Sequence, residues 1–186
     1  MSTGEKPSVR FFIALMPPDE IQDYANQAIE ALSDRYHTRT AKAPPHITLQ
    51  PPFLWQPDAT QQLEMRVNEF ARRQAIVPVT LSGFGAFAPR VLYINVLKTP
   101  ELLTLQANLM NYLEETLGIV DPTTKQRGFS PHLTIASRNL TRQTFKQAWA
   151  DLQTRHVEFE YVSDRLTLLI YDGHCWHIQS EFPCVG

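Results

Sequence analysis

The sequence contains two short segments with the residue types needed for acid–base chemistry, at 45–49 and 131–135. Each reads proline, histidine, aliphatic residue, threonine, aliphatic residue. A bare His-x-Thr is expected by chance about 0.5 times in a chain of this composition, but the full pattern is far rarer. For one such histidine a structural hydrogen bond would be the commoner explanation. Two copies indicate a shared site.

Strand geometry would place the polar side chains of each segment on one face. Side chains alternate between the two faces of a strand, so His46 and Thr48 are expected to point one way. His132 and Thr134 follow the same rule. The aliphatic residues between them would then anchor each strand in the core and fix the positions of the polar pair.

Two imidazoles and two hydroxyls together suit displacement at a phosphodiester. A neutral imidazole can take a proton from the attacking oxygen, and a protonated one can give a proton to the leaving oxygen. Threonine hydroxyls can donate to the non-bridging oxygens as charge develops on them. Neutral donors fit a monoanionic diester, whereas a dianionic monoester usually attracts arginines, a metal or a helix N-terminus.

The surrounding pattern predicts an α+β fold that contains two antiparallel sheets. Strands are expected at 9–15, 47–49, 77–87, 91–97, 133–135 and three times within 157–182, with helices at 19–35, 58–74, 100–118 and 141–155. Pro51 and Pro52 should end the second strand, and 121–130 should form a polar loop. The order strand, helix, hairpin recurs at about 46–97 and 132–182, which suggests a pattern-level repeat.

Each segment contains a tetrad of the form histidine, aliphatic residue, threonine, aliphatic residue, at 46–49 and 132–135. These two tetrads resemble those of the 2H phosphoesterases, and the resemblance extends over 11–15, 90–93 and 129–132. Within that superfamily the chain is similar to the bacterial branch called 2′-5′ RNA ligase or RNA 2′,3′-cyclic phosphodiesterase. The resemblance implies a single bilobal domain over 1–186, with helices outside and pseudo-twofold related His-x-Thr strands facing a central cleft. It also implies hydrolysis of 2′,3′-cyclic phosphates to 2′-phosphates with no metal and no cofactor.

Carried over by position, the resemblance implies an acid–base pair of His46 and His132, with Thr48 and Thr134 holding phosphate oxygens. It favours His132 as the base and His46 as the acid. The better known branch often has an arginine at the position of Ser137, and here the arginine is Arg138. We expect Arg138 to contact phosphate if the chain has left strand geometry by that point.

Aromatic side chains near the tetrads could hold an unpaired base by stacking. Phe53, Tyr93 and Phe129 are the substrate-binding candidates, with Trp55 also considered, although core packing is the commoner role of such residues. Phe129 is favoured because it lies three residues before the second histidine.

Composition limits the remaining possibilities. The net charge of −2 gives no field for duplex nucleic acid or an anionic membrane, and two cysteines suggest free thiols in a reducing cytoplasm. The apolar run 11–16 is too short for a signal or membrane segment. The cluster 172–177 fits no standard metal spacing, and neither a P-loop nor a Gly-x-Ser-x-Gly elbow occurs. We therefore expect a monomer that acts on RNA ends or small cyclic nucleotides, with 2′-5′ ligation by the same groups or RNA-end binding without turnover as alternatives.

Overall fold

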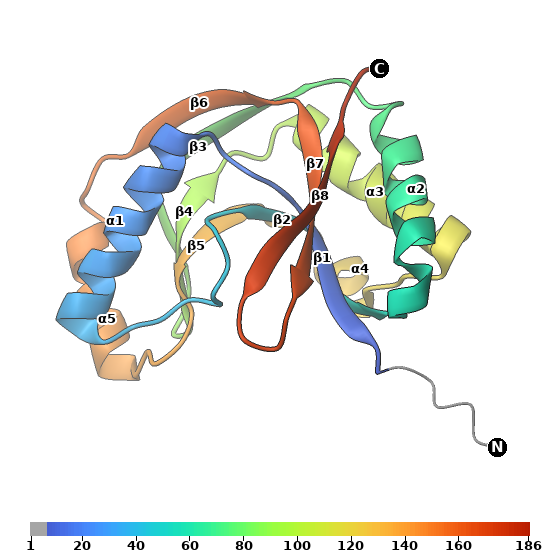
Figure 1. The fold of residues 1–186 in the computed structure, drawn as a ribbon. Helices are drawn as coiled ribbons and strands as arrows, with labels where there is room; N and C mark the ends of the chain where they lie inside the picture. The colour runs from blue at the N-terminus through green and yellow to red at the C-terminus, as the bar shows by residue number, and fades with distance from the viewer. Residues whose placement is uncertain (1–6) are drawn as a thin grey trace.

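The computed structural model describes residues 7–186, in which helices alternate with strands of one curled sheet (Figure 1). The strands are β1 (Val9–Leu15), β2 (Ile47–Trp55), β3 (Val77–Phe87), β4 (Val91–Val96), β5 (His132–Ala136), β6 (Glu158–Ser163), β7 (Arg165–Tyr171) and β8 (Trp176–Pro183). The helices are α1 (Asp19–Tyr36), the short 3-10 turn η1 (Pro57–Ala59), α2 (Thr60–Ala71), α3 (Pro100–Leu117), α4 (Pro122–Arg127) and α5 (Arg142–Leu152). The predicted α+β class with antiparallel pairing is confirmed.

The eight strands form a single sheet in the order β6-β3-β4-β5-β2-β1-β7-β8. The prediction of two separate sheets is therefore corrected. The two halves join where β2 meets β5, through one antiparallel residue pair, Ile47 with Leu133. Sequence patterns place residues on strands but do not show whether two sheets share an edge, and this pairing supplies that edge.

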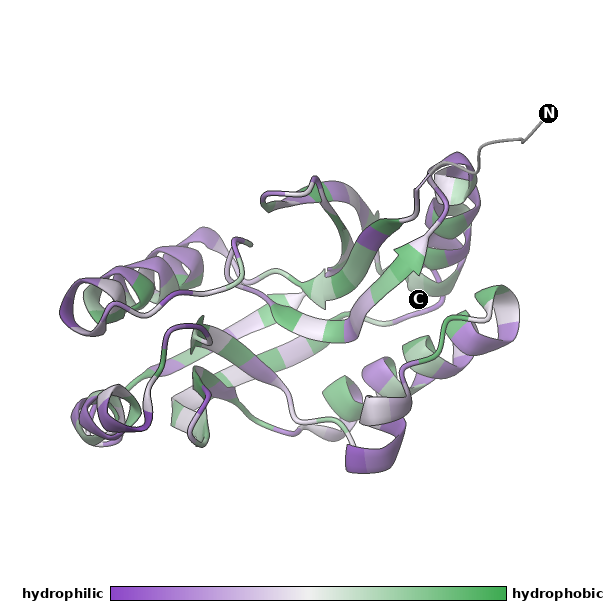
Figure 2. Cartoon of the chain, turned by 90° about the horizontal axis from the view of Figure 1, so that it is seen from below, coloured by the Kyte–Doolittle hydropathy of each residue, from purple (hydrophilic) through white to green (hydrophobic). Residues whose placement is uncertain are grey.

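Two pairs of helices flank the sheet on opposite sides of the molecule (Figure 1). Helix α1 packs on α5 and β5, whereas α2 and α3 pack together, with α3 against β2 and β3 and α2 against β7 and β8. In Figure 2 both the strands and the helices mix hydrophobic and hydrophilic residues. The largest fully buried side chains include Phe11, Ile13, Ile47 and Leu49 from the central strands. The core thus holds the strands that carry the two tetrads.

Two sequence-based predictions of local structure are corrected, the end of the second strand and the loop at 121–130. Strand β2 continues through Pro51 and Pro52, with a bulge in its register against β1. Prolines are tolerated there because the register against β1 is interrupted at 51–52, and the pairing of β2 with β5 within residues 7–186 is limited to Ile47. The segment predicted as a loop contains the short helix α4, which begins where Asp121 accepts a bond from the Thr124 backbone N–H at 2.9 Å.

Candidate active site

Both tetrads lie on central strands with the same alternation of buried and partly exposed residues. In each, the two aliphatic residues and the proline that precedes the tetrad are buried, while the histidine and the threonine are partly exposed. Ile47, Leu49, Leu133 and Ile135 are at most 1% exposed. Burial of every second residue fixes the strand, so the polar side chains emerge on the opposite face at defined positions.

The junction between β2 and β5 brings the two histidines to one cavity. Ile47 and Leu133 follow the histidines directly and pair with each other. His46 and His132 both line a cavity of about 150 Å³, together with Thr134 and Ser137. Its other lining residues come mainly from the loop between α1 and β2. Within residues 7–186, the two imidazoles are the only titratable side chains that line this cavity.

Each imidazole is held by the same backbone bond. Nδ1 of His46 lies 2.7 Å from the Pro44 carbonyl oxygen, and Nδ1 of His132 lies 2.7 Å from the Ser130 carbonyl oxygen. A carbonyl oxygen only accepts hydrogen bonds, so Nδ1 must carry the proton in both rings. The neutral rings therefore keep the lone pair on Nε2. Each Nε2 is available to accept a proton, or to donate one once it is protonated.

Aromatic rings support the two imidazoles from different strands. Phe12 of β1 lies 4.7 Å from the His46 ring, measured between centroids. Phe87 and Tyr93 lie 4.9 and 5.2 Å from the His132 ring. Tyr93 can approach because it pairs with Gly85, where an added Cβ would stand 2.3 Å from the Tyr93 ring. The apolar rings fix both imidazoles and withdraw them from water.

Burial sets the protonation of the pair. Desolvation lowers the pKa of His46 and of His132 below the ordinary value, although the backbone carbonyl bond opposes this in each case. The charge of His132 lowers the pKa of His46 further. Each ring thus favours its neutral form more strongly than a free histidine does, and charging one disfavours charging the other.

The structure separates the predicted site residues into two groups. Thr134 lines the histidine cavity, and Tyr93 contacts His132. Thr48 is partly exposed, pairs with Ala14 of β1, and is not among the residues of 7–186 that line the histidine cavity. Phe53 stacks on Phe11 at 6.3 Å between centroids, and Phe129, like Phe53, is partly buried against the core. Within residues 7–186 neither of these two rings contacts a histidine ring.

Arg138 lies just beyond the end of β5, which stops at Ala136, so the chain has left strand geometry there. The backbone of Arg138 pairs instead with Arg39 in an isolated bridge. Ser137 lines the histidine cavity, whereas Arg138 lines a neighbouring pocket. The Arg138 side chain therefore lies beside the histidine cavity and does not line it.

Sequence reasoning missed Phe12 and Phe87 as neighbours of the histidines, and Trp176, whose ring lies 4.6 Å from Phe12. Phe12 and Phe87 come from strands distant in the sequence from the histidines they touch. Phe12 belongs to a run read only as core. A usable signal was the position of Phe87 at the end of a predicted hairpin strand, since hairpin pairing brings it close to Tyr93.

The cluster in the β7–β8 turn is more compact than its sequence spacing suggests. Possible ligand atoms of Asp172, Cys175 and His177 lie within 4.8 Å of one another. Asp172 accepts the backbone N–H groups of His174 and Cys175 at 2.7 and 2.8 Å, and its other oxygen lies 2.6 Å from Nε2 of His177. These bonds, the backbone ones first, hold the pKa of Asp172 well below its usual range. The atoms thus form a hydrogen-bonded turn, and both cysteines are free thiols as predicted.

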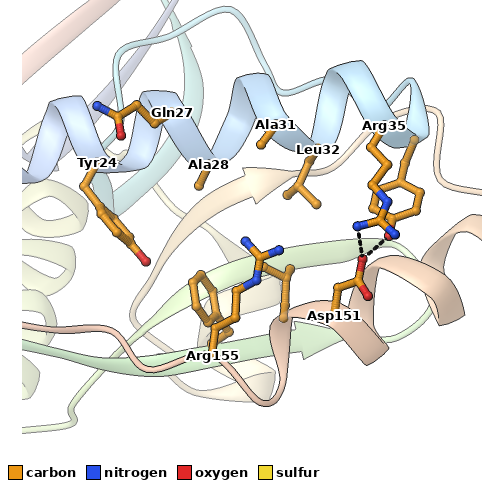
Figure 3. Close-up of a pocket in the computed structure, with 11 residues that line it drawn as sticks. Tyr24, Gln27, Ala28, Ala31, Leu32, Arg35, Asp151 and Arg155 are labelled. Atoms are coloured by element: carbon orange, nitrogen blue, oxygen red, sulfur yellow. Dashed lines mark hydrogen bonds and ion pairs between the residues drawn. The ribbon is translucent and has the colours of Figure 1, made fainter.

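A second cavity of about 300 Å³ lies between α1 and α5 (Figure 3). Tyr24 and Arg155 point into it, and Arg35 is paired with Asp151 at 2.8 Å. Tyr36 also donates a hydrogen bond to Asp151. These contacts join the two helices, and no histidine lines this cavity. The pair of His46 and His132 lies at the β2–β5 junction instead.

The curled antiparallel sheet and its paired His-x-Thr strands fit the class of two-histidine phosphoesterases. The family model described as "2′-5′ RNA ligase superfamily" matches residues 17–174. The chain belongs to this superfamily of 2H phosphoesterases. No helix within 7–186 combines the length and the apolar character needed to cross a membrane.

Relatives in sequence support this assignment, and solved structures share the fold. A protein named as a phosphoesterase from Bacillus cereus (strain G9842) is 31% identical, covering 91% of this chain and 94% of its own. Another from Geobacillus sp. (strain WCH70) is 28% identical, covering 96% and 98%. LigT of E. coli complexed with 3′-AMP shares the fold with a TM-score of 0.69 at 18% identity, covering 96% and 99%. Thermus thermophilus TT0787 has a TM-score of 0.65 at 21% identity, covering 95% and 98%.

Proposed function

We propose that this protein hydrolyses 2′,3′-cyclic phosphates, on RNA ends or small nucleotides, to 2′-phosphates. One observation carries the proposal: two imidazoles with Nδ1 tethered and Nε2 free line a single cavity that holds no other titratable side chain within residues 7–186. The reaction needs one proton removed and one delivered, and the two rings supply both. Membership of a superfamily with phosphoesterase relatives supports the same class of reaction.

The chemistry balances with a water molecule as the second reactant. Neutral Nε2 of one histidine takes a proton from the water as its oxygen attacks phosphorus. The bond between phosphorus and O3′ breaks, and the protonated Nε2 of the other histidine gives its proton to O3′. The product carries a 2′-phosphate and a free 3′-hydroxyl. The two rings exchange charge states in the reaction, and proton exchange with solvent restores them.

His132 is proposed as the base and His46 as the acid. His132 is the less buried ring of the two, which suits a group that must meet water. His46 lies deeper, between the proline-rich loop and Phe12, where a leaving oxygen can be protonated away from bulk solvent. The hydroxyls of Thr48 and Thr134 are proposed to donate to the non-bridging oxygens. Donors aimed at developing charge typically contribute about 10²–10³ in rate each.

Ligation that forms a 2′-5′ bond is the second candidate, because the same groups could serve a transesterification in which a 5′-hydroxyl replaces water. The bond between phosphorus and O5′ then forms, and the bond between phosphorus and O3′ breaks as in hydrolysis. The superfamily name and the similarity to LigT favour testing it. LigT of E. coli has been crystallised with 3′-AMP and with phosphate, both phosphate-containing ligands. A comparable ligand in the present cavity fits the proposed chemistry.

Product analysis distinguishes these functions. The protein is incubated with an oligonucleotide that ends in a 2′,3′-cyclic phosphate. EDTA is added to remove metal ions, because the proposed mechanism uses the two imidazoles for both proton transfers. We expect 2′-phosphate ends. A 2′-5′ junction would instead establish ligation, and an unchanged substrate that is nevertheless bound would establish recognition without turnover. Products formed equally well by the His46→Gln and His132→Gln variants would exclude the two-histidine mechanism.

A further inference from the structure

A cationic pocket lies next to the histidine cavity and is not used by the proposed chemistry. Its volume is about 260 Å³, and its lining includes Arg10, Lys42 and Arg138 but, among residues 7–186, no aspartate or glutamate. Tyr171 and Trp176 provide aromatic walls. Within residues 7–186, none of the three cations forms a salt bridge with a carboxylate. The pocket thus offers three positive charges to an external anion.

The two cavities share walls made of single chain segments. In the loop between α1 and β2, Ala41 and Ala43 line the histidine cavity while Lys42 lines the cationic pocket. After β5, Ser137 lines the first and Arg138 lines the second. Adjacent residues of each segment therefore line different cavities, so one chain segment lies between the two cavities in both places.

Aromatic rings form a second connection between the cavities. Trp176 packs edge-on against Phe12 with 4.6 Å between centroids, and Phe12 lies 4.7 Å from His46. One phenyl ring therefore separates the indole from the catalytic imidazole.

Two of the cations are already held in place. The Arg10 guanidinium lies over the Tyr171 ring at 4.3 Å, and Lys42 Nζ lies 2.8 Å from Nε2 of His174. The backbone N–H of Trp176 donates to the Lys42 carbonyl at 2.7 Å, which ties the loop to the start of β8. Side chains that are fixed before binding lose less entropy when an anion arrives.

We propose that this pocket binds a second phosphate of the substrate, on the 5′ side of the nucleotide whose cyclic phosphate occupies the histidine cavity. The inference rests on the proposed function and makes it more specific. The substrate is then an oligoribonucleotide end rather than an isolated nucleoside cyclic phosphate. The phosphates of a nucleic acid chain recur at every nucleotide, so neighbouring anions match neighbouring pockets, and the aromatic walls suit stacking of a base.

Three substrates separate the contribution of the 5′-phosphate to kcat/KM from that of the second base. They are a nucleoside 2′,3′-cyclic phosphate, the same compound with a 5′-phosphate, and a dinucleotide that ends in the cyclic phosphate. We expect kcat/KM to be at least tenfold higher for the second and third than for the first, mainly through KM. A further rise from the second to the third would measure base stacking, and the preference should weaken as salt concentration is raised.

The double variant Lys42→Ala/Arg138→Ala should reduce the preference for the 5′-phosphorylated substrate about tenfold. The matched control is Arg142→Ala/Lys146→Ala, which removes the same charge from exposed positions of α5. The control should keep both the preference and the activity. Equal kcat/KM for the first two substrates, or an unchanged preference in the Lys42 and Arg138 variant, would overturn the second-phosphate site.

Equilibrium binding separates this inference from the proposed function. Calorimetry compares a nucleoside 3′,5′-bisphosphate with the corresponding 3′-monophosphate on wild type and on both double variants. Tighter binding of the bisphosphate that is lost only in the Lys42 and Arg138 variant would support the pocket even if no cyclic phosphate is hydrolysed. Equal affinities for the two ligands would overturn the pocket even if hydrolysis is observed.

Discussion

Replacement of each histidine by glutamine should reduce the turnover of a 2′,3′-cyclic phosphate by about 10³–10⁴. A proton transfer is worth about 10²–10⁴ in rate. The upper part of that range applies because no other titratable side chain within residues 7–186 lines the cavity and could take over the missing role. At about 1.36 kcal/mol per decade, the loss is about 4–5.5 kcal/mol of transition-state stabilisation.

A second substrate assigns the two roles. A deoxynucleoside 3′-(p-nitrophenyl phosphate) has no 2′-hydroxyl, and its leaving group departs without protonation. If His46 is the acid, the His46→Gln variant should lose less than about tenfold on this ester while it loses the full amount on the cyclic substrate. The His132→Gln variant should lose activity on both, because water still needs a base. Initial rates measured at saturating substrate give the comparison.

His156→Gln serves as the control, since the His156 side chain is 85% exposed and does not line the cavity. Its activity should equal that of wild type, and circular dichroism should show that all three variants are folded. An equal loss for His46→Gln on both substrates would contradict its role as the acid. The reverse pattern between the two variants would exchange the roles, and full activity of either on the cyclic substrate would refute the mechanism.

Three further predictions concern stability and transition-state contacts. The folded-state pKa of His46 and that of His132 lie below the unfolded value, so the contribution of these residues to stability is complete above about pH 6.5 and decreases as the pH falls, because the unfolded chain binds protons first. Urea unfolding at about pH 7.5 and 5.5 should therefore show a smaller decrease for the double glutamine variant than for wild type. Leu133→Ala should cost about 2–5 kcal/mol in the same assay, because Leu133 is fully buried at the junction of the two halves; a cost below about 1 kcal/mol would refute that account. Thr134→Val should lower kcat about 10²-fold with little change in stability, and an unchanged kcat would remove Thr134 from the phosphate site.

The two tetrads were predictable because their polar residues alternate with aliphatic residues at the two-residue period of a strand. The aliphatic residues at 47, 49, 133 and 135 alternate with the polar ones, and the structure buries all four. The start of α3 at Pro100 and its end at Gly118 were predictable for a similar local reason. Thr99 accepts a bond from the Leu102 N–H, and Gly118 adopts a left-handed conformation with φ of 65°.

Contacts between distant segments were not predictable. The pairing of Ile47 with Leu133 depends on which strand edges meet, and Phe12 reaches His46 only because β1 and β2 are neighbours. Arg138 lines the cationic pocket rather than the histidine cavity because of the way the chain turns after β5. Each of these facts depends on the path of the backbone, and a one-dimensional pattern does not contain that path.

Gly85 has a consequence for how this chain can vary. A methyl group there would need the space that the Tyr93 ring occupies, and that ring lies against His132. Any larger residue at position 85 must therefore be accompanied by a smaller one at position 93. Among homologous sequences the two positions should co-vary, and a library randomised at both should recover active clones in compensating pairs.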